Sequence, residues 1–585
     1  MYLEKVNGPA DIKLLNTDQL RVLADETRHY LLQKVSEHGG HIGPNLGMVE
    51  ATVALHYVFN SPEDKIVFDV SHQSYPHKIL TGRKEAFMDR SHYDDVSGYS
   101  EPSESAHDHF VIGHTSTSVS LACGLAKGRD LLGGKENVIA VIGDGSLSGG
   151  EALEGFDVAG SELKSNFIII VNDNQMSIAE NHGGIYENLA LLRRTNGQAE
   201  CNVFRAMGLD YLYVADGNDV ESLIKAFQQV KDTDHPVVVH INTLKGKGYK
   251  PAETDKERWH WGMPFNLATG EPLHPFTGED YGDLTARRLL ELMPSHPGLV
   301  AMTAGTPAVM GFVRERREQA GHQFVDVGIA EETAVAMASG IAKRGGKPVW
   351  GVYSTFIQRT YDQLSQDLCV NDNPALIMVF GGGLGFMNDV THTCFYDIPL
   401  LMNIPNLIYL APSCREEYFS MLEWALAYRK HPVAIRVPSN GVVSRTGASL
   451  ATDWAAPAYE VRRQGEDVAI LGLGSYQQLG EQLADALEAE GLHPTLVNPR
   501  IITSLDEATL ADIEKRHRLV VTLEDGQADG GWGEKIARHF GTSPVKVMVR
   551  GGRKQFEDRY VLADLLEANR LTVPQLVADV KALLG

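Results

Sequence analysis

Short apolar runs rich in β-branched residues alternate along the chain with stretches whose apolar residues recur every three or four positions. In the first part of the chain these runs are residues 65–70, 137–142, 166–171 and 237–242. We interpret the runs as buried strands and the stretches between them as amphipathic helices, a pattern typical of parallel α/β layers. One helix is expected to begin at about Thr17, a suitable N-cap residue before a periodic apolar face.

The same alternation recurs in two later parts of the chain. The second part has expected strands at residues 324–327, 348–352 and 375–380, and the third has them at residues 468–471, 495–497, 519–523 and 545–549. A helix is expected over residues 477–489 in the third part. Residues 251–282 and 439–457 show no periodicity, so we interpret them as a linker and an irregular segment.

These three parts predict an α/β protein with mainly parallel sheets. We place its domains at residues 1–277, 278–445 and 446–585. The chain length of 585 residues agrees with several domains, since a domain averages about 150 residues. Hydrophobic residues make up 43% of the chain and charged residues 22%, which excludes collagen-like, coiled-coil and broadly disordered proteins.

The charge balance bears on possible partners. Lys and Arg number 53 against 76 Asp and Glu, a formal net charge of −23. An acidic chain repels phosphate backbones and no local basic patch stands out, so we expect no nucleic-acid partner. Five scattered cysteines without a C-x-x-C pair favour reduced thiols, and no apolar run approaches the roughly 20 residues of a membrane span. We therefore expect a soluble cytoplasmic protein with no membrane partner.

Two short polar motifs follow directly after predicted strands. The first is GDG at residues 143–145 and the second is NDN at residues 172–174. Because ligands bind at the carboxyl ends of parallel strands, both motifs are expected at one edge of the sheet. The Asp144 carboxylate and the Asn174 side-chain carbonyl are hard oxygen donors suited to Mg²⁺, and the glycines let the backbone approach a diphosphate.

The alternative is that both motifs are ordinary strand-to-helix turns. GDG alone favours that alternative, whereas GDG and NDN together at two strand ends favour a ligand site. The chain has no P-loop motif and no well-placed G-x-G-x-x-G, which argues against P-loop and Rossmann proteins. The His-Asp-His run at residues 107–109 lacks an evident third ligand, so we do not assign a metal to it.

The GDG and NDN spacing resembles that of thiamine-diphosphate enzymes. The surrounding residues resemble the 1-deoxy-D-xylulose-5-phosphate synthase family of the transketolase superfamily over nearly the whole chain. The resemblance is carried by VALHYVF (53–59), SHQSYPHKILTGR (71–83), GHTSTS (113–118), VIGDGSLSGGEA (141–152), NDNQMSI (172–178), KGKGYKPAE (245–253), DVGIAEE (326–332) and YSTFIQRTYDQL (353–364). It implies a transketolase-like thiamine-diphosphate-binding fold.

The resemblance also implies the site residues. Mg²⁺ would be held by Asp144, Asn174 and the carbonyl of Met176. Residues expected to line thiamine diphosphate are His77, Gly113, His114, Thr115, Gly145, Ser146, Asn174, Tyr249, Glu331 and Phe356. Expected catalytic residues are Glu331, at N1′ of the aminopyrimidine, with His41, His260 and His392; expected substrate contacts are Tyr353, Arg359 and Arg436.

The residues around Glu331 agree with its implied role. Glu331 follows a predicted strand and a Gly328 turn and opens an apolar helix. In such surroundings a carboxyl group is expected to have a raised pKa, so that it shares a proton with a ring nitrogen. The alternative is a glutamate that only complements the dipole of the helix N-terminus.

The sequence departs from the family where the acceptor phosphate is expected. Gly381 replaces an arginine, Asn388 replaces an aspartate, and residues 436–440 lack a second arginine. Glu332 and Thr333 replace a Gln-His pair after Glu331. A charge-assisted hydrogen bond contributes about 1.5–3 kcal/mol, so losing one weakens a phosphorylated acceptor by about tenfold or more. These departures leave the expected cofactor chemistry unchanged and the acceptor open.

The resemblance therefore implies a carboligase that uses thiamine diphosphate and Mg²⁺. It would decarboxylate pyruvate and transfer the two-carbon unit to glyceraldehyde 3-phosphate or a related aldehyde, in isoprenoid and thiamine biosynthesis. The alternatives are a transketolase-type ketol transferase, a carboligase with another acceptor, and a non-catalytic cofactor-binding paralogue. Small-molecule substrates and a homodimer are the partners that the family implies.

Overall fold

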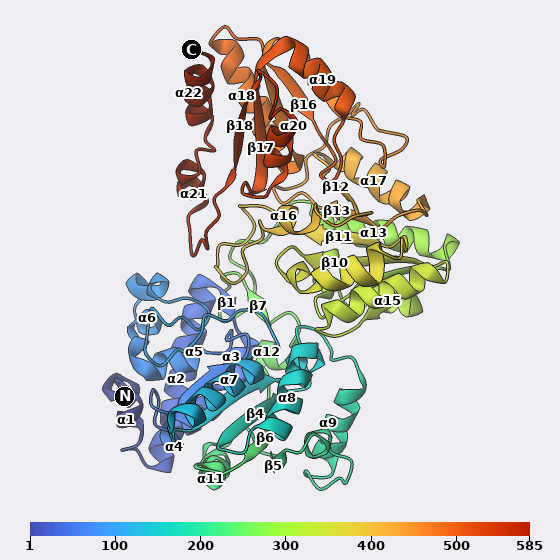
Figure 1. The fold of residues 1–585 in the computed structure, drawn as a ribbon. Coiled ribbons are helices and arrows are strands. Elements are labelled where there is room, and N and C mark those ends of the chain that lie inside the picture. Colours follow the sequence, from blue (N-terminus) through green and yellow to red (C-terminus); the bar gives the residue numbers. More distant parts are fainter. The chain divides into compact units, whose positions relative to one another are not determined.

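Three large sheets organise the chain, which the computed structural model describes over residues 1–585 (Figure 1). The chain divides into a first unit, residues 1–277 with 328–330, and a second unit, residues 278–327 with 331–585. The first unit contains one of the large sheets and the second contains two. The predicted α/β class with mainly parallel sheets is confirmed, whereas the three domain ranges stay predictions.

The sheet of the first unit has the strand order β2-β3-β4-β6-β5, and all neighbours are parallel. Its strands are β2 (Lys65–Phe68), β3 (Val138–Gly143), β4 (Phe167–Asp173), β5 (Asp210–Val214) and β6 (Pro236–Asn242). Four of them are the predicted apolar runs. The edge strand β5 was not predicted, because only its last residue is fully buried and its sequence mixes aromatic and polar residues.

Helices cover both faces of this sheet (Figure 1). The helices of the unit are α1 (Pro9–Ile12), α2 (Thr17–His38), α3 (Gly43–Gly47), α4 (Val49–Val58), α5 (Tyr75–Lys78), α6 (Glu85–Met88), α7 (Ser118–Leu132), α8 (Gly150–Glu162), α9 (Gly184–Arg194), α10 (Val203–Ala206), α11 (Val220–Val230) and α12 (Lys250–Thr254). Ile168 and Ile170 share a core with α2, α4 and α11, whereas Ile169 and Val171 share the other core with α7 and α8. This alternation is why β4 is apolar at consecutive positions.

The expected start of α2 at Thr17 is confirmed, but its N-cap lies one residue earlier. Asn16, not Thr17, is the N-cap: its side chain accepts a hydrogen bond from the backbone N–H of Gln19 at 3.0 Å. The Gln19 side chain accepts in turn from the backbone N–H of Asn16, which completes a capping box. This reciprocal pair of hydrogen bonds satisfies the backbone N–H groups of Asn16 and Gln19 at the start of the helix.

The expected linker at residues 251–282 is wrong in its first half. It contains most of α12 and the short strand β7 (Trp261–Gly262), which pairs antiparallel with β1 (Gly40–His41). Pairing over only two residues produces no periodic pattern in a sequence, so the pattern alone could not reveal it. The ribbon sets His41 opposite Trp261, and it therefore brings the segment before Trp261 to His41.

The second unit begins with an all-parallel sheet of order β12-β13-β11-β10-β8-β9. Its strands are β8 (Leu299–Thr303), β9 (Phe324–Asp326), β10 (Lys347–Tyr353), β11 (Leu376–Phe380), β12 (Ile408–Leu410) and β13 (Val433–Arg436). Its helices are α13 (Tyr281–Leu292), α14 (Arg314–Ala320), α15 (Glu331–Lys343), α16 (Asp397–Leu401) and α17 (Arg415–Ala427). The predicted strands are β9, β10 and β11.

The other sheet of this unit has the order β14-β16-β15-β17-β18, with only β14 antiparallel. Its strands are β14 (Glu460–Arg463), β15 (Asp467–Gly472), β16 (Thr495–Asn498), β17 (His517–Gln527) and β18 (Lys546–Gly552). Its helices are α18 (Gln477–Ala489), which matches the predicted range, α19 (Glu507–Arg516), α20 (Trp532–His539), α21 (Leu562–Ala568) and α22 (Val573–Leu584). None of the helices of the chain is both long and apolar enough to cross a membrane.

Candidate functional site

The GDG and NDN motifs meet at the carboxyl edge of the first unit's sheet. Strands β3 and β4 are neighbours, and Gly143 pairs in register with Asn172. Asp144 lies in the turn after β3 and is 1% exposed. Asn181 Nδ2 donates to Asp144 Oδ2 at 2.7 Å, whereas the buried Asp144 Oδ1 has no hydrogen-bond partner. The predicted meeting of the two motifs at one edge is confirmed.

This edge has the chemistry of a divalent cation site. Burial, with the nearby charge of Asp173, raises the pKa of Asp144 to about 7. A buried carboxylate oxygen without a partner costs free energy unless a cation or a donor meets it. Asn174, buried beside it, contributes a side-chain oxygen that accepts only from the backbone N–H of Met176, at 3.2 Å. These hard oxygens suit Mg²⁺.

The backbone around this edge is unusual for non-glycine residues. Val70, Ser71, Ser116 and Gln175 all have φ between 57° and 72°, in the left-handed region. Such residues tend to gather at binding sites, where the surrounding structure holds them in place. Gly145 meets a different constraint, since a Cβ there would lie 2.9 Å from the Cα of Ser177. The turns after β3 and β4 are therefore packed closely against each other.

The GHTSTS loop, residues 113–118, is tied to the same edge. Asp69, at the end of β2, accepts hydrogen bonds at 2.9 Å from the backbone N–H groups of Ser116, Thr117 and Ser118. Ser116 Oγ donates to the carbonyl of Ser146 at 2.8 Å, which joins this loop to the GDG turn. Two loops that are bonded to each other therefore carry five predicted cofactor-lining residues: Gly113, His114, Thr115, Gly145 and Ser146. Asp69 was not singled out from the sequence.

Three histidine rings lie together in the first unit. The ring centroids of His41 and His72 are 4.9 Å apart, those of His41 and His260 are 5.6 Å apart, and those of His72 and His260 are 5.2 Å apart. Asn45, fully buried, donates from Nδ2 to the carbonyls of His41 and His72 at 2.9 and 2.7 Å. We call His41, His72 and His260 the histidine cluster. The sequence predicted His41 and His260 but not His72.

Lys245 connects the histidine cluster to the NDN turn. Its Nζ lies 2.6 Å from the carbonyl of Ser177 and 3.1 Å from Nδ1 of His260. Burial lowers the pKa of Lys245 to about 7, and burial with the charge of Lys245 holds the pKa of His260 well below its ordinary value. His260 is therefore neutral near pH 7. Because Nδ1 accepts from Lys245, we assign the ring proton to Nε2.

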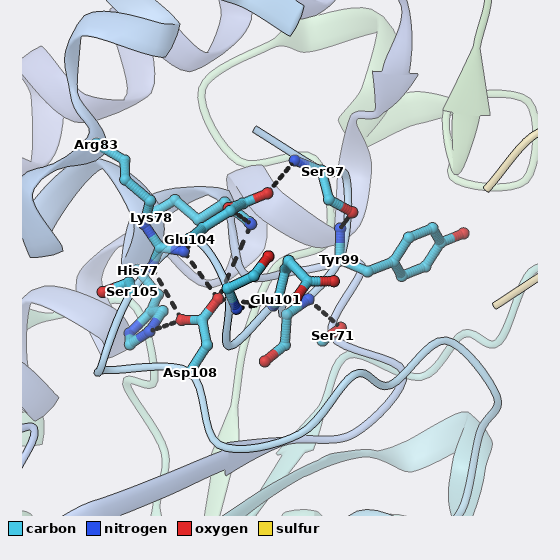
Figure 2. Close-up of polar contacts among 12 residues, drawn as sticks. Ser71, His77, Lys78, Arg83, Ser97, Tyr99, Glu101, Glu104, Ser105 and Asp108 are labelled. Carbon is cyan, nitrogen blue, oxygen red and sulfur yellow. Dashed lines mark hydrogen bonds and ion pairs between the residues drawn. The ribbon is translucent and has the colours of Figure 1, made fainter. Parts of the chain in front are cut away.

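His77 does not join the histidine cluster. Its Nδ1 lies 2.9 Å from Nε2 of His56. Its Nε2 lies 3.0 Å from Oδ1 of Asp108 (Figure 2). The ring is 2% exposed, and both of its nitrogens are engaged. Both ring nitrogens of His77 therefore already have partners, and its expected role in lining a cofactor stays a prediction. Within SHQSYPHK it is His72 that lies beside His41 and His260, and spacing alone could not distinguish the two histidines.

Tyr249 lies in an aromatic cluster behind the KGKGY turn. Its ring centroid is 5.0 Å from that of Trp259 and 5.9 Å from that of Phe265, and its hydroxyl donates to the carbonyl of Leu267 at 3.2 Å. These contacts bury Tyr249 to 7% exposure. Tyr249 thus packs the chain segment that carries Lys245 and His260.

Glu331 is the first residue of α15 in the second unit and is 3% exposed. Burial raises its pKa to about 7, even though the guanidinium of Arg359, with Nη1 at 3.7 Å from Oε2, acts in the opposite direction. The expected rise of this pKa is found. A carboxyl group that titrates near pH 7 can both hold and release a proton under physiological conditions.

We predict that Arg359→Met moves the alkaline limit of activity to higher pH. The Arg359 charge lowers the pKa of Glu331, so its removal raises that pKa further and Glu331 keeps its proton to higher pH. The measurement is kcat against pH from about pH 6 to about pH 10, at saturating substrate. If kcat of the variant falls at the same alkaline pH as in the wild type, that fall does not result from deprotonation of Glu331. Any change in KM is judged separately, because Arg359 is also an expected substrate contact.

Aromatic side chains gather at the carboxyl ends of β10 and β11. The Tyr353 ring centroid is 6.1 Å from that of Phe356 and 5.6 Å from that of Phe386, and the Phe356 centroid is 5.7 Å from that of His392. Gly381, with φ of 70°, lies directly under Phe386: a Cβ on Gly381 would be 2.5 Å from that ring. Phe386 therefore occupies the space that a side chain at residue 381 would need.

Arg436 is engaged by two carboxylates. Its Nε donates to Oδ2 of Asp397 at 2.7 Å, its Nη1 donates to Oδ1 of Asp525, and the residue is 4% exposed. These contacts balance its charge and raise its pKa well above the ordinary value. Two carboxylates therefore neutralise the charge of Arg436 inside the protein, and its expected contact with substrate stays a prediction. The sequence showed the arginine but not the distant Asp525.

Comparison with known proteins gives matches along most of the chain. A family model described as 1-deoxy-D-xylulose-5-phosphate synthase matches residues 3–203 and 195–243. Models of the pyrimidine-binding and C-terminal domains of transketolase match residues 279–442 and 458–551.

Three similar curated proteins all carry the name 1-deoxy-D-xylulose-5-phosphate synthase. The protein from Alkaliphilus oremlandii is 37% identical over 626 residues, covering 99% of each chain. The protein from Natranaerobius thermophilus is 38% identical, covering 91% of this chain and 90% of its own. The protein from Thermomicrobium roseum is also 38% identical, covering 92% of this chain and 90% of its own.

Proposed function

The chain belongs to the 1-deoxy-D-xylulose-5-phosphate synthase family, and on that premise we propose that it decarboxylates pyruvate and joins the remaining two-carbon unit to glyceraldehyde 3-phosphate. Family membership makes it a thiamine-dependent transferase of the transketolase superfamily. The observation that carries the proposal is the buried, unpartnered Asp144 Oδ1 at the meeting point of GDG and NDN. This oxygen atom supports a cation that would bind the diphosphate of the cofactor, as expected for the family.

The residues present fit thiamine diphosphate with Mg²⁺. Asp144, Asn174 and the Met176 carbonyl would hold the cation, and the closely packed GDG turn and the GHTSTS loop would receive the diphosphate. When bound, the cofactor supplies the electron sink for cleaving and forming carbon–carbon bonds. Glu331 would hold a proton at a ring nitrogen of the cofactor, as its pKa of about 7 allows.

The histidine cluster would donate hydrogen bonds to oxygen atoms of the substrate. His260 is neutral with its proton on Nε2, so it can donate a hydrogen bond to a carbonyl or carboxylate oxygen. His41 and His72 lie within ring-contact distance of it, fixed through their backbones by Asn45. A donor set held in place before the substrate arrives stabilises developing charge at little reorganisation cost. We also propose a homodimer and a cytoplasmic location, on the family expectation alone.

A second candidate function is carboligation to an unphosphorylated aldehyde. Phe386 covers Gly381, and ion pairs with Asp397 and Asp525 neutralise the charge of Arg436. An aromatic surface binds an apolar or hydroxylated aldehyde more readily than a phosphate dianion, which needs cationic or N–H donors. The decarboxylation of pyruvate is the same in both candidates, so the acceptor alone distinguishes them.

The test combines purified protein, thiamine diphosphate, Mg²⁺ and pyruvate with either glyceraldehyde 3-phosphate or glyceraldehyde. Release of CO₂ with formation of the five-carbon phosphate supports the proposed function. A higher kcat/KM for glyceraldehyde, falling by about tenfold or more in Phe386→Ala, supports the second candidate. No CO₂ release with any acceptor, from protein that binds the cofactor, would instead identify a non-catalytic paralogue.

A further inference from the structure

A group of buried charges lies beside the histidine cluster without belonging to it. Lys78 is fully buried, and Asp108 is 5% exposed. Arg83 bonds both oxygens of Asp108, at 2.8 and 2.9 Å, and Lys78 Nζ lies 2.5 Å from Oε2 of Glu104 (Figure 2). Arg83 Nη1 also lies 3.2 Å from the same Glu104 oxygen, so two cations and two anions form one network. We call Lys78, Arg83, Glu104 and Asp108 the charge network.

The carboxylates of the charge network also bind the backbone of the loop formed by residues 97–108. Glu104 Oε1 accepts from the backbone N–H of Ser97 at 2.5 Å, and Asp108 Oδ2 accepts from that of Glu101 at 2.8 Å. Between these two points, the N–H of Tyr99 donates to Ser97 Oγ at 3.1 Å and the N–H of Ser100 donates to Ser71 Oγ at 2.7 Å. A loop without regular secondary structure thus has its N–H groups around Tyr99 satisfied by side chains.

This anchoring decides where Tyr99 lies. Its side chain points away from the charge network (Figure 2), and its ring centroid is 5.7 Å from that of His41, at an interplanar angle of 72°. Ser71, which anchors the next residue of the loop, directly precedes His72. The same contacts therefore fix the loop relative to two members of the histidine cluster.

We propose that Tyr99 is a further residue of the histidine site and that Glu104 and Asp108 are positioning residues acting through it. Tyr99 sets the orientation of His41 toward the substrate, so this inference rests on the proposed function. Burying four charges is costly because each loses hydration, and a buried ion pair is weak evidence for stability. Here the network has a second effect, since the two carboxylates fix the backbone on either side of Tyr99.

The kinetic test compares single and double variants of the full-length protein with cofactor, Mg²⁺, pyruvate and the better acceptor. We expect Tyr99→Ala to lower kcat by about tenfold with little change in KM, because misplacing a reacting group costs rate rather than binding. Tyr99→Phe, which keeps the ring, should stay within about twofold of wild type. Glu104→Gln should also cost about tenfold, but less than about twofold in the Tyr99→Ala background, because both changes act on one group.

A matched control removes the carboxylate of Glu37, which lies on α2 and forms an ion pair with the exposed Arg90. Glu37 bonds Arg90 at the start of the segment that leads to the loop, and it takes no part in the charge network. Glu37→Gln should leave kcat at the wild-type value. Independent effects of Glu104→Gln and Tyr99→Ala, multiplying to about a hundredfold loss, would overturn the proposal.

A spectroscopic arm needs no catalysis. In protein with isotope-labelled histidine, the ring signal of His41 senses the Tyr99 ring, so it should shift in Tyr99→Ala and in Glu104→Gln but not in Glu37→Gln. An unchanged His41 signal in Tyr99→Ala would overturn the inference even if the enzyme turned over. If the His41 signal shifts but the wild-type protein does not turn over pyruvate, the contact between Tyr99 and His41 is supported and the proposed function is refuted. If Glu104→Gln does not fold, Ser71→Ala, which removes the acceptor of the Ser100 N–H, replaces it in both arms.

Discussion

Glu331→Ala is expected to abolish turnover of pyruvate, with a loss on the order of 10³-fold in kcat. The carboxyl group is buried at the start of α15, and burial raises its pKa to about 7, so it can exchange a proton near pH 7. Glu331→Gln should be equally impaired, because an amide keeps the shape but cannot release the proton. The measurements are CO₂ release and exchange of the C2 proton of added thiamine diphosphate.

The matched control for this change is the next residue in the chain. Glu332 is only half-buried in the same first turn of α15, so Glu332→Gln removes a neighbouring charge without touching the proposed proton carrier. Its turnover should stay within about threefold of wild type. Thermal unfolding should show that Glu331→Ala still folds, since Oε2 makes no hydrogen bond and loses a contact of 3.7 Å with Arg359. Wild-type rates of C2 exchange in Glu331→Ala would show that another group carries the proton.

Asp144→Asn is expected to remove the stabilisation that Mg²⁺ and thiamine diphosphate give to the wild-type protein. At ligand concentrations of about 100 times Kd, binding stabilises the native state by about 2.7 kcal/mol, and this gain should vanish at the same concentrations in the variant. The physical reason is that asparagine keeps the bond to Asn181 but loses the negative charge that a divalent cation needs. Thermal unfolding with and without both ligands measures the difference.

The control for Asp144→Asn lies on α8, which follows the GDG turn. Asp157 is an exposed carboxylate on this helix, and Asp157→Asn should keep the full ligand-dependent stabilisation. Calorimetric titration with Mg²⁺ in the presence of thiamine diphosphate provides a readout that is independent of turnover. Undiminished stabilisation of Asp144→Asn by the two ligands would place the cation elsewhere.

The sequence predicted the sheets better than the connections between them. Consecutive apolar residues in β3, β4 and β6 are needed because helices cover both faces of the sheet, and that need is visible in the sequence. The edge strand β5 and the two-residue strands β1 and β7 lack such a pattern. Their positions depend on pairing partners that are distant in the chain, which periodicity cannot report.

The candidate site likewise contains residues that the sequence could predict and residues that it could not. Asp144 and Asn174 could be found because each directly follows a strand, and their approach depends only on two strands being neighbours. His72 could not be separated from His77, because the choice depends on which ring meets Asp108 and which meets His41. The pairing of Arg436 with Asp525 likewise joins β13 to β17, 89 positions apart. Side-chain partners at such separations follow from the folded structure rather than from a motif.

The β1–β7 ribbon also bears on the order in which this site can form. It pairs His41 with Trp261, and so brings His260 to His41 across almost the whole sequence of the first unit. Closing so long a loop lowers the conformational entropy of the chain before the new contacts stabilise it. Contacts between residues far apart in the sequence therefore tend to form late in folding. The sheet edge that carries Asp144 needs residues only as far as β6, which ends at Asn242. During synthesis, the proposed cation site can therefore assemble while the segment that completes the histidine cluster is still inside the ribosome.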